Sequence, residues 1–416
     1  MTASTPQRSA ATTVPDLDAK PDKAAWQAVW ASAVGYAMDG FDLLILGFAL
    51  TAISATFSLS GAQAGSLATI TLLGAVLGGF AGGILSDYIG RVKVLTYSIL
   101  VFAVFTALTG LAPNFVLLTV FRFVAGIGLG AEFGVGMTLA AETWPAKMRA
   151  RATSYVALGW QSGVLLAAIV SAWAIPLIGW RGLFLLGVIP AVLAFFVRRT
   201  VDEPALFEAS RDAARQRFPL RLLFRDTQTT KSTIGMFVLT SVQNFGYYGV
   251  IIWLPSYLAK QYGFGLTKSA VWTGVTILGM AAGIFVFGHL ADRFGRRPML
   301  FVFQAGAAIS VLAYSRLDNE GALLVGGAIM GVFVNGMLGG YGALMAELYP
   351  TPARATAQNV LFNLGRGVGG FAPLVIAALA TAYSFQLAIG LLAVIYVIDI
   401  IATMFLIPER KGLALE

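Results

Sequence analysis

Long apolar segments alternate with short polar ones between residues 26 and 407. Each apolar segment has about 20 residues, which is the length that an α-helix needs to cross roughly 30 Å of hydrocarbon. The pattern predicts an all-α membrane protein with twelve transmembrane helices and both termini on one side. The expected spans are 26–55, 64–86, 94–112, 115–141, 153–176, 181–197, 232–257, 269–291, 298–315, 321–346, 356–380 and 386–407.

The composition agrees with this pattern. Hydrophobic residues make up 58% of the 416 residues and charged residues only 12%, whereas a soluble protein carries about twice that charged share. The chain has no cysteine, which excludes a disulfide framework, a thiol nucleophile and a cysteine-bound metal. We interpret the single histidine, His289, as a structural residue at a helix end, and we expect no metal site.

Basic residues gather in one alternate set of loops. The positive-inside rule assigns this set to the cytoplasm, and therefore places both termini there. This bias also accounts for most of the net charge of +8, so the charge does not indicate nucleic-acid binding. The opposite loops carry little beyond Arg181, Lys260, Lys268 and Arg316, whereas the basic set contains Arg91, Lys93, Lys147, Arg149, Arg151, Arg198, Arg199, Arg293, Arg296, Arg297 and Arg354.

The longest polar interval, 198–231, divides the spans six and six. Its arginines and apolar residues predict a cytoplasmic linker that contains an amphipathic helix lying along the membrane. The polar tail 1–24 shows no signal-peptide pattern, and we expect it to be disordered in the cytoplasm. The linker then separates an N-terminal six-helix bundle, 25–197, from a C-terminal six-helix bundle, 232–407, which a cytoplasmic tail, 408–416, follows.

The two halves repeat each other. GILSDYIGR at 83–91 matches GHLADRFGR at 288–296, and ETWPAKMRA at 142–150 matches ELYPTPARA at 347–355. Both pairs are offset by the same 205 residues, which is strong evidence for an internal repeat. Two parallel repeats with a substrate site between them near the membrane midplane are typical of a transporter.

The first matched pair places an acid, a glycine turn and an arginine at the ends of successive spans. Its carboxylates can pair with the arginine that follows, or cap a neighbouring helix N-terminus. Either contact would latch the cytoplasmic ends of two helices together and open as the halves move. The residues of this loop motif are Gly83, Asp87, Gly90 and Arg91 in the first copy and Gly288, Asp292, Arg293, Gly295 and Arg296 in the second.

With these motifs the chain resembles the major facilitator superfamily over essentially its whole length. The loop motif is that superfamily's signature, although Tyr88 stands where a basic residue is usual. RFVAGIGLG at 122–130 is similar to the fourth-helix motif, and the second matched pair looks like the E-x-x-P-x-x-x-R loop. The resemblance implies a charge network made of Arg122, Glu142, Arg149, Glu347 and Arg354.

Two branches of that superfamily share features with this chain. DGFD at 39–42 resembles the first-helix motif of the aromatic acid:proton and the sialate/lactate:proton symporters. GAEFG at 130–134 and GWRGLFLLGVIP at 179–190 look closer to the sialate-type group. Both groups carry organic anions together with protons, so the resemblance implies organic-acid:proton symport.

Four acids, Asp39, Asp42, Glu132 and Asp399, fall inside apolar spans, where a charge is costly. Asp39 and Asp42 are three residues apart and share a helix face. Two nearby carboxylates in a medium of low dielectric constant cannot both ionise cheaply, so one is expected to hold a proton, as a proton-coupling site requires. A structural ion pair or an N-terminal feature of a broken helix is the alternative. Glu132, deep in the fourth span, is a second proton carrier or a partner of Arg366.

Arg366 lies about ten residues into the eleventh span, which is near mid-membrane at ~1.5 Å per residue. Its guanidinium suits a substrate carboxylate. The alternative is a permanent salt bridge to Asp39, Asp42 or Glu132. The repeat offset equates Gln161 with Arg366, so the acids lie in one half and this cation in the other.

Further residues are candidates for the cavity and for structure. Trp160 and Phe41 could stack on a substrate, or simply pack. Asp399 is expected to be structural, and Arg122 to pair with an acid of the first span or to tune the proton path. The same offset equates Asp39 with Asn244 and Asp42 with Tyr247. The expected substrate-binding set, besides Arg366, is Gln161, Gln243, Asn244, Tyr247, Asn335, Tyr341 and Asn363.

These observations predict a proton-coupled symporter that imports a small organic anion by alternating access. A carrier of sugars or drugs, working as a uniporter or antiporter, is the alternative. No P-loop, metal cluster or nucleophile–histidine pair indicates an enzyme, and no cofactor is expected besides protons as the coupling ion. We expect a monomer in the lipid bilayer of a bacterial cytoplasmic (inner) membrane, with no nucleic-acid partner.

Overall fold

The computed structural model describes residues 20–189, 192, 200–209, 218–413 and 415. All regular structure within these ranges is helical, as expected. Eleven of the described helices or helix pairs are long and apolar enough to cross a membrane. Most of the expected disordered tail, and the centre of the expected amphipathic linker helix at 210–217, lie outside the described residues.

The first half contains helices α1 to α5. Polar caps fix where several begin: Asp22 accepts a hydrogen bond from the backbone N–H of Ala25, and Ser60 forms a capping box with Gln63. The fifth and sixth expected spans form one long helix that bends at Gly179 (φ 70°), and the end of the sixth span lies outside the described residues. The helices are α1 (Lys23–Phe57), α2 (Gly61–Ile89), α3 (Arg91–Gly110), α4 (Phe115–Thr143) and α5 (Arg149–Leu185).

The second half contains three unbroken spans and three broken ones. A short helix, α8 (Pro219–Leu222), precedes it. The tenth expected span is interrupted at Met337, the eleventh after Gly369 and the twelfth at Leu391. The elements are α9 (Thr227–Tyr262), α10 (Leu266–Phe294), α11 (Arg296–Tyr314), α12 (Glu320–Gly336), α13 (Leu338–Leu348), α14 (Arg354–Gly369), α15 (Ala372–Ala382), α16 (Phe385–Gly390) and α17 (Leu392–Leu406).

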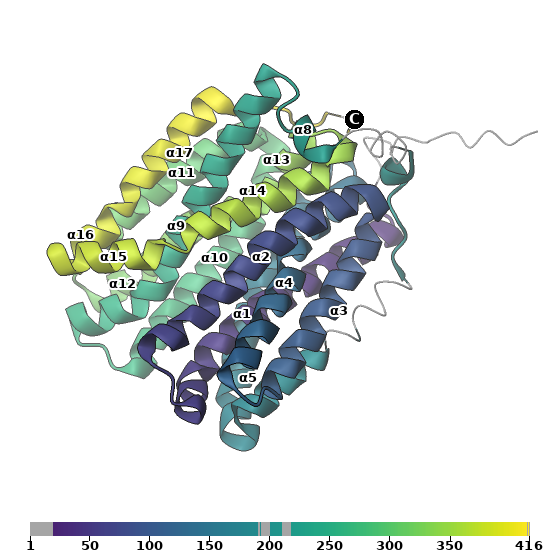
Figure 1. Ribbon diagram of the computed structural model, residues 1–416. Coiled ribbons are helices and arrows are strands. Elements are labelled where there is room, and N and C mark those ends of the chain that lie inside the picture. The colour runs from purple at the N-terminus through teal and green to yellow at the C-terminus, as the bar shows by residue number, and fades with distance from the viewer. Residues whose placement is uncertain (1–19, 190–191, 193–199, 210–217, 414, 416) are drawn as a thin grey trace, which may run out of the picture.

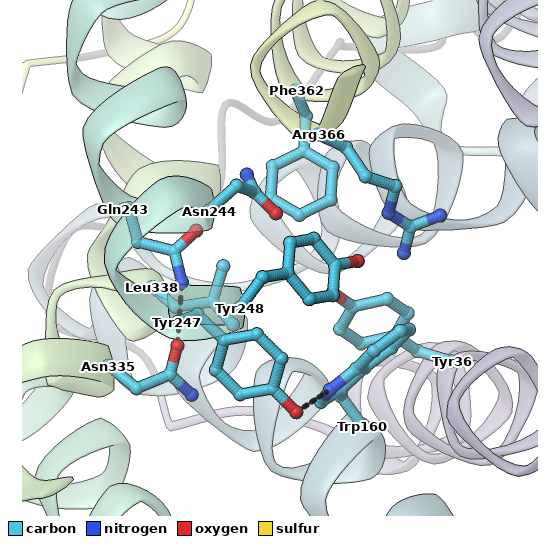
Figure 2. Close-up of a pocket in the computed structure, with 10 residues that line it drawn as sticks. All are labelled: Tyr36, Trp160, Gln243, Asn244, Tyr247, Tyr248, Asn335, Leu338, Phe362 and Arg366. Atoms are coloured by element: carbon cyan, nitrogen blue, oxygen red, sulfur yellow. Dashed lines mark hydrogen bonds between the residues drawn. The ribbon is translucent and has the colours of Figure 1, made fainter. Parts of the chain in front are cut away.

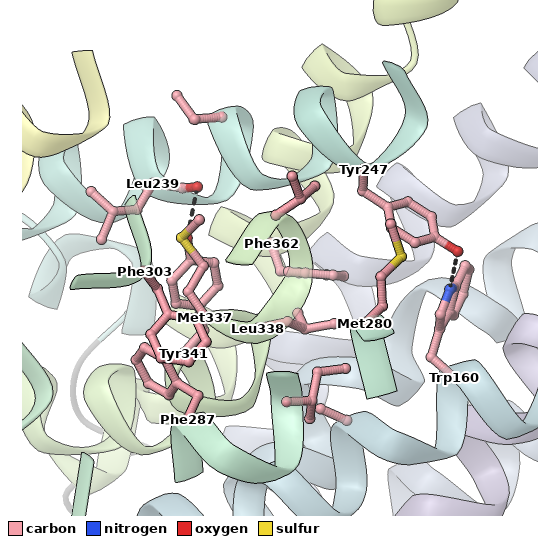
Figure 3. Packing of buried hydrophobic residues seen from close by; sticks show 14 of the residues in the cluster. Trp160, Leu239, Tyr247, Met280, Phe287, Phe303, Met337, Leu338, Tyr341 and Phe362 are labelled. Atoms are coloured by element: carbon pink, nitrogen blue, oxygen red, sulfur yellow. Dashed lines mark hydrogen bonds between the residues drawn. The ribbon is translucent and has the colours of Figure 1, made fainter. Parts of the chain in front are cut away.

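The halves meet along two seams. Helix α14 of the second half packs on α2 and α4 of the first, and α5 of the first half packs on α10 and α13 of the second (Figure 1). The interior of the second half is aromatic and methionine-rich. Phe287 and Phe303 pack edge to face with ring centroids 4.9 Å apart, and the Tyr341 hydroxyl donates to the carbonyl of Leu239 (Figure 3).

We call the end of the molecule that carries the two loop motifs the motif end. There each motif aspartate caps a helix of the other half. Asp87 accepts hydrogen bonds from the N–H groups of Ala355 and Thr356 at the start of α14, at 3.3 and 2.8 Å. Asp292 accepts from Ala150 and Arg151 at the start of α5, at 3.0 and 3.1 Å. All three positions are related by the offset of 205 residues, so the repeat extends to these contacts.

Two buried ion clusters complete the closure of the motif end. Glu142 binds Arg91 of its own half at 3.1 Å and Arg354 of the other half at 2.6 Å. The repeat-related Glu347 binds Arg296 of its own half and Arg149 of the other half, both at 2.9 Å. Of the five residues named for a charge network, Glu142, Arg149, Glu347 and Arg354 form ion pairs here, and Arg122 lies elsewhere.

The glycine turn of each motif also has a defined role. Gly90 (φ 122°) and Gly295 (φ 108°) adopt a backbone conformation that residues with a Cβ rarely take. Each turn lets a glutamate from a later segment reach the helix N-terminus that follows. Glu203 accepts from the N–H of Arg91 at 2.7 Å, and Glu409 accepts from the N–H of Arg297 at 2.8 Å. The sequence analysis did not identify these two caps.

Candidate functional site

A small pocket lies between the halves, and Figure 2 shows its lining side chains. Its open volume is about 10 Å³, which leaves room for about one water molecule. The first half supplies Tyr36 from α1 and Trp160 from α5. The remaining lining residues come from the second half and are Gln243, Asn244, Tyr247, Tyr248, Asn335, Leu338, Phe362 and Arg366.

Arg366 is the cation of this pocket. Its Nη2 donates to Asp39 Oδ2 at 3.1 Å, which joins α14 to α1 across the two halves. Among the described residues, Arg366 Nε and Asp39 Oδ1 are buried without a hydrogen-bond partner. The guanidinium carbon lies 5.1 Å from the ring centre of Trp160 and 5.5 Å from that of Phe362. Arg366 therefore has hydrogen-bonding capacity that its ion pair does not use.

Asp42, one helical turn further along α1, has a much more complete set of partners. Arg122 donates to both of its carboxylate oxygens, at 3.1 and 2.7 Å, and Thr106 Oγ1 donates at 2.5 Å. Arg122 Nε also reaches Thr71 at 3.3 Å. This pair lies wholly within the first half, and it answers the question of which acid of the first span Arg122 meets.

Glu132 of α4 differs from both aspartates. It is 2% exposed, and neither carboxylate oxygen has a hydrogen-bond partner among the described residues. Its Oε1 would lie 2.8 Å from a Cβ built on Gly35, so the glycine makes room for the carboxyl group against α1. An ionised carboxylate in this position would be uncompensated, so the environment favours the neutral acid.

The opposite wall of the pocket is polar but uncharged. Gln243 of α9 donates from Nε2 to Asn335 Oδ1 of α12 at 2.6 Å. Asn335 and Leu338 flank the break at Met337, where the interrupted span brings backbone and side chains to the pocket. Asn244 donates to the carbonyl of Thr240 on its own helix.

Trp160 and Tyr247 separate the pocket from a larger cavity. Trp160 Nε1 donates to the Tyr247 hydroxyl at 2.9 Å, across the two halves. Both residues, together with Tyr248, also line a cavity of about 450 Å³ on the side away from the motif end. Its other walls are mostly apolar residues of α1, α2, α5, α9 and α15. The hydrogen-bonded aromatic pair therefore belongs to the wall that the pocket and the cavity share.

The structure brings together only part of the expected binding set. Gln243, Asn244, Tyr247, Asn335 and Arg366 line the pocket, and so does Trp160, for which packing was the alternative. The other candidates are buried away from its lining: neither amide atom of Gln161 has a partner among the described residues, Tyr341 bonds to Leu239, Asn363 bonds to the carbonyl of Gly130, and Phe41 packs within the first half.

Besides Trp160, four lining residues lie outside the expected substrate-binding set: Tyr36, Tyr248, Leu338 and Phe362. Phe362 precedes Arg366 by one helical turn and lies on the same side of α14, so helical spacing from the arginine would have identified it. Leu338 follows a helix break that hydropathy does not reveal. Asp399 lies far along the chain in α17, where Gln304 donates to it at 2.9 Å. His289 lies against Tyr155 and Phe285 at the seam of α5 and α10.

Comparison with known proteins identifies the family. Its model, described as Major Facilitator Superfamily, matches residues 32–278 and 270–415. The chain belongs to the Major Facilitator Superfamily. As a member of this superfamily it is a multi-pass membrane transporter and not an enzyme. The expected architecture of twelve transmembrane helices in two six-helix pseudo-repeat bundles is confirmed, because solved superfamily members share its fold.

Three comparisons support this placement in the superfamily. The chain is 59% identical over 398 residues to the "Putative metabolite transport protein" of Haemophilus influenzae, covering 94% of this chain and 98% of the relative. It is 34% identical over 383 residues to the cis,cis-muconate transport protein of Acinetobacter baylyi, covering 90% and 92%. The fold matches the proton:xylose symporter XylE bound to 6-bromo-6-deoxy-D-glucose with a TM-score of 0.81, at 18% identity, covering 95% and 98%.

Proposed function

We propose that this transporter is a proton-coupled symporter that imports a small organic anion by alternating access. The observation that carries the proposal is the incomplete coordination of Arg366. Its one ion pair, to Asp39, leaves a buried Nε without a partner beside an aromatic pocket. A guanidinium binds a carboxylate best through two parallel hydrogen bonds, so an incoming carboxylate offers Arg366 more than Asp39 does.

The names of relatives agree with an organic anion. The Acinetobacter relative is named for transport of cis,cis-muconate. The structural resemblance to a xylose symporter raises the possibility of a sugar carrier. A carrier of neutral sugars would not need a buried arginine with an unused hydrogen-bond donor in the pocket. The resemblance to that symporter is one of fold.

The charges around the pocket support a specific proposal for proton coupling. Asp39, Asp42 and Glu132 together carry three negative charges when ionised, and Arg122 and Arg366 carry two positive ones. One bound proton makes this cluster neutral. We assign it to Glu132, whose carboxylate oxygens have no partner among the described residues. When an anion binds Arg366, the cluster needs one more proton to be neutral again.

We place that second proton on Asp39. The substrate carboxylate takes over Arg366, and Asp39, left without its cation in a buried position, takes up a proton. The loaded carrier is then neutral and can reorient, since no uncompensated charge remains in the barrier. Asp42 keeps Arg122 throughout, which holds the third acid ionised. One proton accordingly accompanies each singly charged anion.

The closed motif end fits the outward-facing side of such a cycle. The proposal places the motif end at the cytoplasm of a bacterial inner membrane, as the basic loops predict, and treats the functional unit as a monomer. Import then requires the Trp160–Tyr247 contact to open first. The two crossed caps and the Glu142 and Glu347 clusters must separate afterwards.

Purified protein in liposomes tests the proposal directly. An inward proton gradient should drive accumulation of a labelled organic acid from a panel of short monocarboxylates, benzoates and sialic acid. Arg366→Lys should weaken binding about tenfold or more, because the fork is lost. Arg225→Lys, at an exposed arginine, is the control and should bind normally. Unchanged affinity of the Arg366→Lys variant would show that Arg366 is not the carboxylate anchor. Drug or sugar transport would then be tested on the same liposomes.

A further inference from the structure

The amide pair of Gln243 and Asn335 is only half satisfied. Their mutual hydrogen bond uses one amide donor and one amide acceptor. Gln243 Oε1 and Asn335 Nδ2 remain buried and have no partner among the described residues. Exchanging the oxygen and nitrogen of both amides keeps their mutual hydrogen bond and again leaves one donor and one acceptor free. Unsatisfied buried polar groups are costly, so this pair points to a ligand.

The pair lies across the pocket from the carboxylate anchor. Figure 2 shows Gln243 and Asn335 on one side and Arg366 on the other, with the rings of Tyr248 and Tyr247 between them. A molecule whose carboxylate meets Arg366 and whose body packs on these rings would bring its far end to the amide pair. The far wall carries no charged side chain among the described lining residues.

We propose that the amide pair selects anions that carry a neutral hydrogen-bonding group, above all a hydroxyl, at the end remote from the carboxylate. This inference rests on the proposed role of Arg366. A hydroxyl oxygen can accept from Asn335 Nδ2 and donate to Gln243 Oε1 at the same time, which satisfies both free groups. A second carboxylate, in contrast, would add a charge with no cation to balance it, so the pair disfavours dianions.

Matched ligands on two scaffolds test this selection in purified protein. The first series is benzoate, 3-hydroxybenzoate, 4-hydroxybenzoate and terephthalate, and the second is propionate, 3-hydroxypropionate and succinate. Binding is measured by calorimetry. On the scaffold that binds, the best-placed hydroxyl should tighten binding about tenfold over the parent acid, since two modest hydrogen bonds are gained. The dianion should bind more weakly than the parent.

The double variant Gln243→Met/Asn335→Leu should bind the parent acid normally and lose the preference for the hydroxyl. Replacing both amides avoids leaving one of them without a partner. Gln161→Met, at a buried amide outside the pocket, is the matched control and should keep the preference. A hydroxyl that gains nothing, a dianion that binds best, or a preference that survives the double variant would each overturn this inference while leaving the carboxylate anchor intact. Binding of the parent acid that is unchanged by Arg366→Lys would instead overturn the proposed function.

Discussion

Asp39 and Arg366 form a single 3.1 Å hydrogen bond that joins the first helix of one half to the eleventh span of the other. Asp42, three residues away, instead holds Arg122 through both oxygens and stays within its own half. The two aspartates thus differ in what their ionisation controls. Ionisation of Asp39 affects the contact between the halves, whereas ionisation of Asp42 affects the stability of the first half.

Asp39→Asn should abolish proton-driven accumulation while preserving exchange of substrate across the membrane. The amide keeps the size of the side chain but cannot take up a proton, so reorientation no longer depends on one. Uptake under a proton gradient and counterflow without a gradient, measured on the same liposomes, separate the two activities. Concentrative uptake by Asp39→Asn would show that the proton is carried elsewhere.

Asp42→Asn should damage folding more than Asp39→Asn. It leaves Arg122 buried with no carboxylate, and removing one partner of a buried ion pair costs about 3–5 kcal/mol. Thermal unfolding in detergent measures the difference. The double variant Asp42→Asn/Arg122→Met should recover much of the lost stability and regain accumulation, because the pair carries no net charge and, in the proposed mechanism, no transported proton. Equal unfolding temperatures for the two single variants would contradict the distinction between the two pairs.

Glu132→Gln should leave stability, substrate binding and accumulation close to those of the parent protein. The proposal assigns the resident proton to this acid, and the amide reproduces its neutral form. Glu132→Lys, which buries a cation beside Gly35, is the contrasting variant and should prevent function. If Glu132→Gln binds and exchanges substrate but cannot concentrate it, Glu132 carries the transported proton.

Weakening the crossed contacts at the motif end should shift the protein toward a state that is open at that end. Asp87→Asn and Asp292→Asn should have similar effects, because the two carboxylates occupy repeat-related positions with matching partners. The chain contains no cysteine, so paired spin labels on introduced cysteines report the separation of the motif ends without background. Glu320→Gln, in a more exposed pair with Lys268, is the control. Unchanged separations in both aspartate variants would show that the crossed caps do not hold the end closed.

Asp399→Asn should be tolerated, whereas Asp399→Leu should lower the unfolding temperature. Asp399 is fully buried, and no cation among the described residues pairs with it; its recorded partner is the Gln304 amide. An asparagine can still hydrogen-bond to that amide, whereas a leucine leaves the amide with its hydrogen bond to Thr403 alone. A transport defect in a stable Asp399→Asn variant would show that this acid does more than join α11 to α17.

Hydropathy and the repeat predicted most of this fold from sequence. Backbone N–H and C=O groups that are exposed to lipid must be hydrogen-bonded within the segment, so each apolar segment is expected to be a helix. The pairing of acids with arginines could not be predicted, since it depends on helix rotation. Periodicity placed Asp39 and Asp42 on one face, yet that face meets a cation of each half. The break at Met337 and the caps made by Glu203 and Glu409 were also invisible, because they depend on tertiary contacts.

The crossed caps have a consequence for how the protein is assembled. Each half, taken alone, would present a motif aspartate with nothing to cap, and a helix start, at Ala150 or Ala355, whose N–H groups have lost their acceptor. The halves are therefore complementary at two points, and at each point an aspartate of one half caps a helix N-terminus of the other. Two fragments divided in the 198–231 segment and produced in the same cell should therefore associate in the correct register.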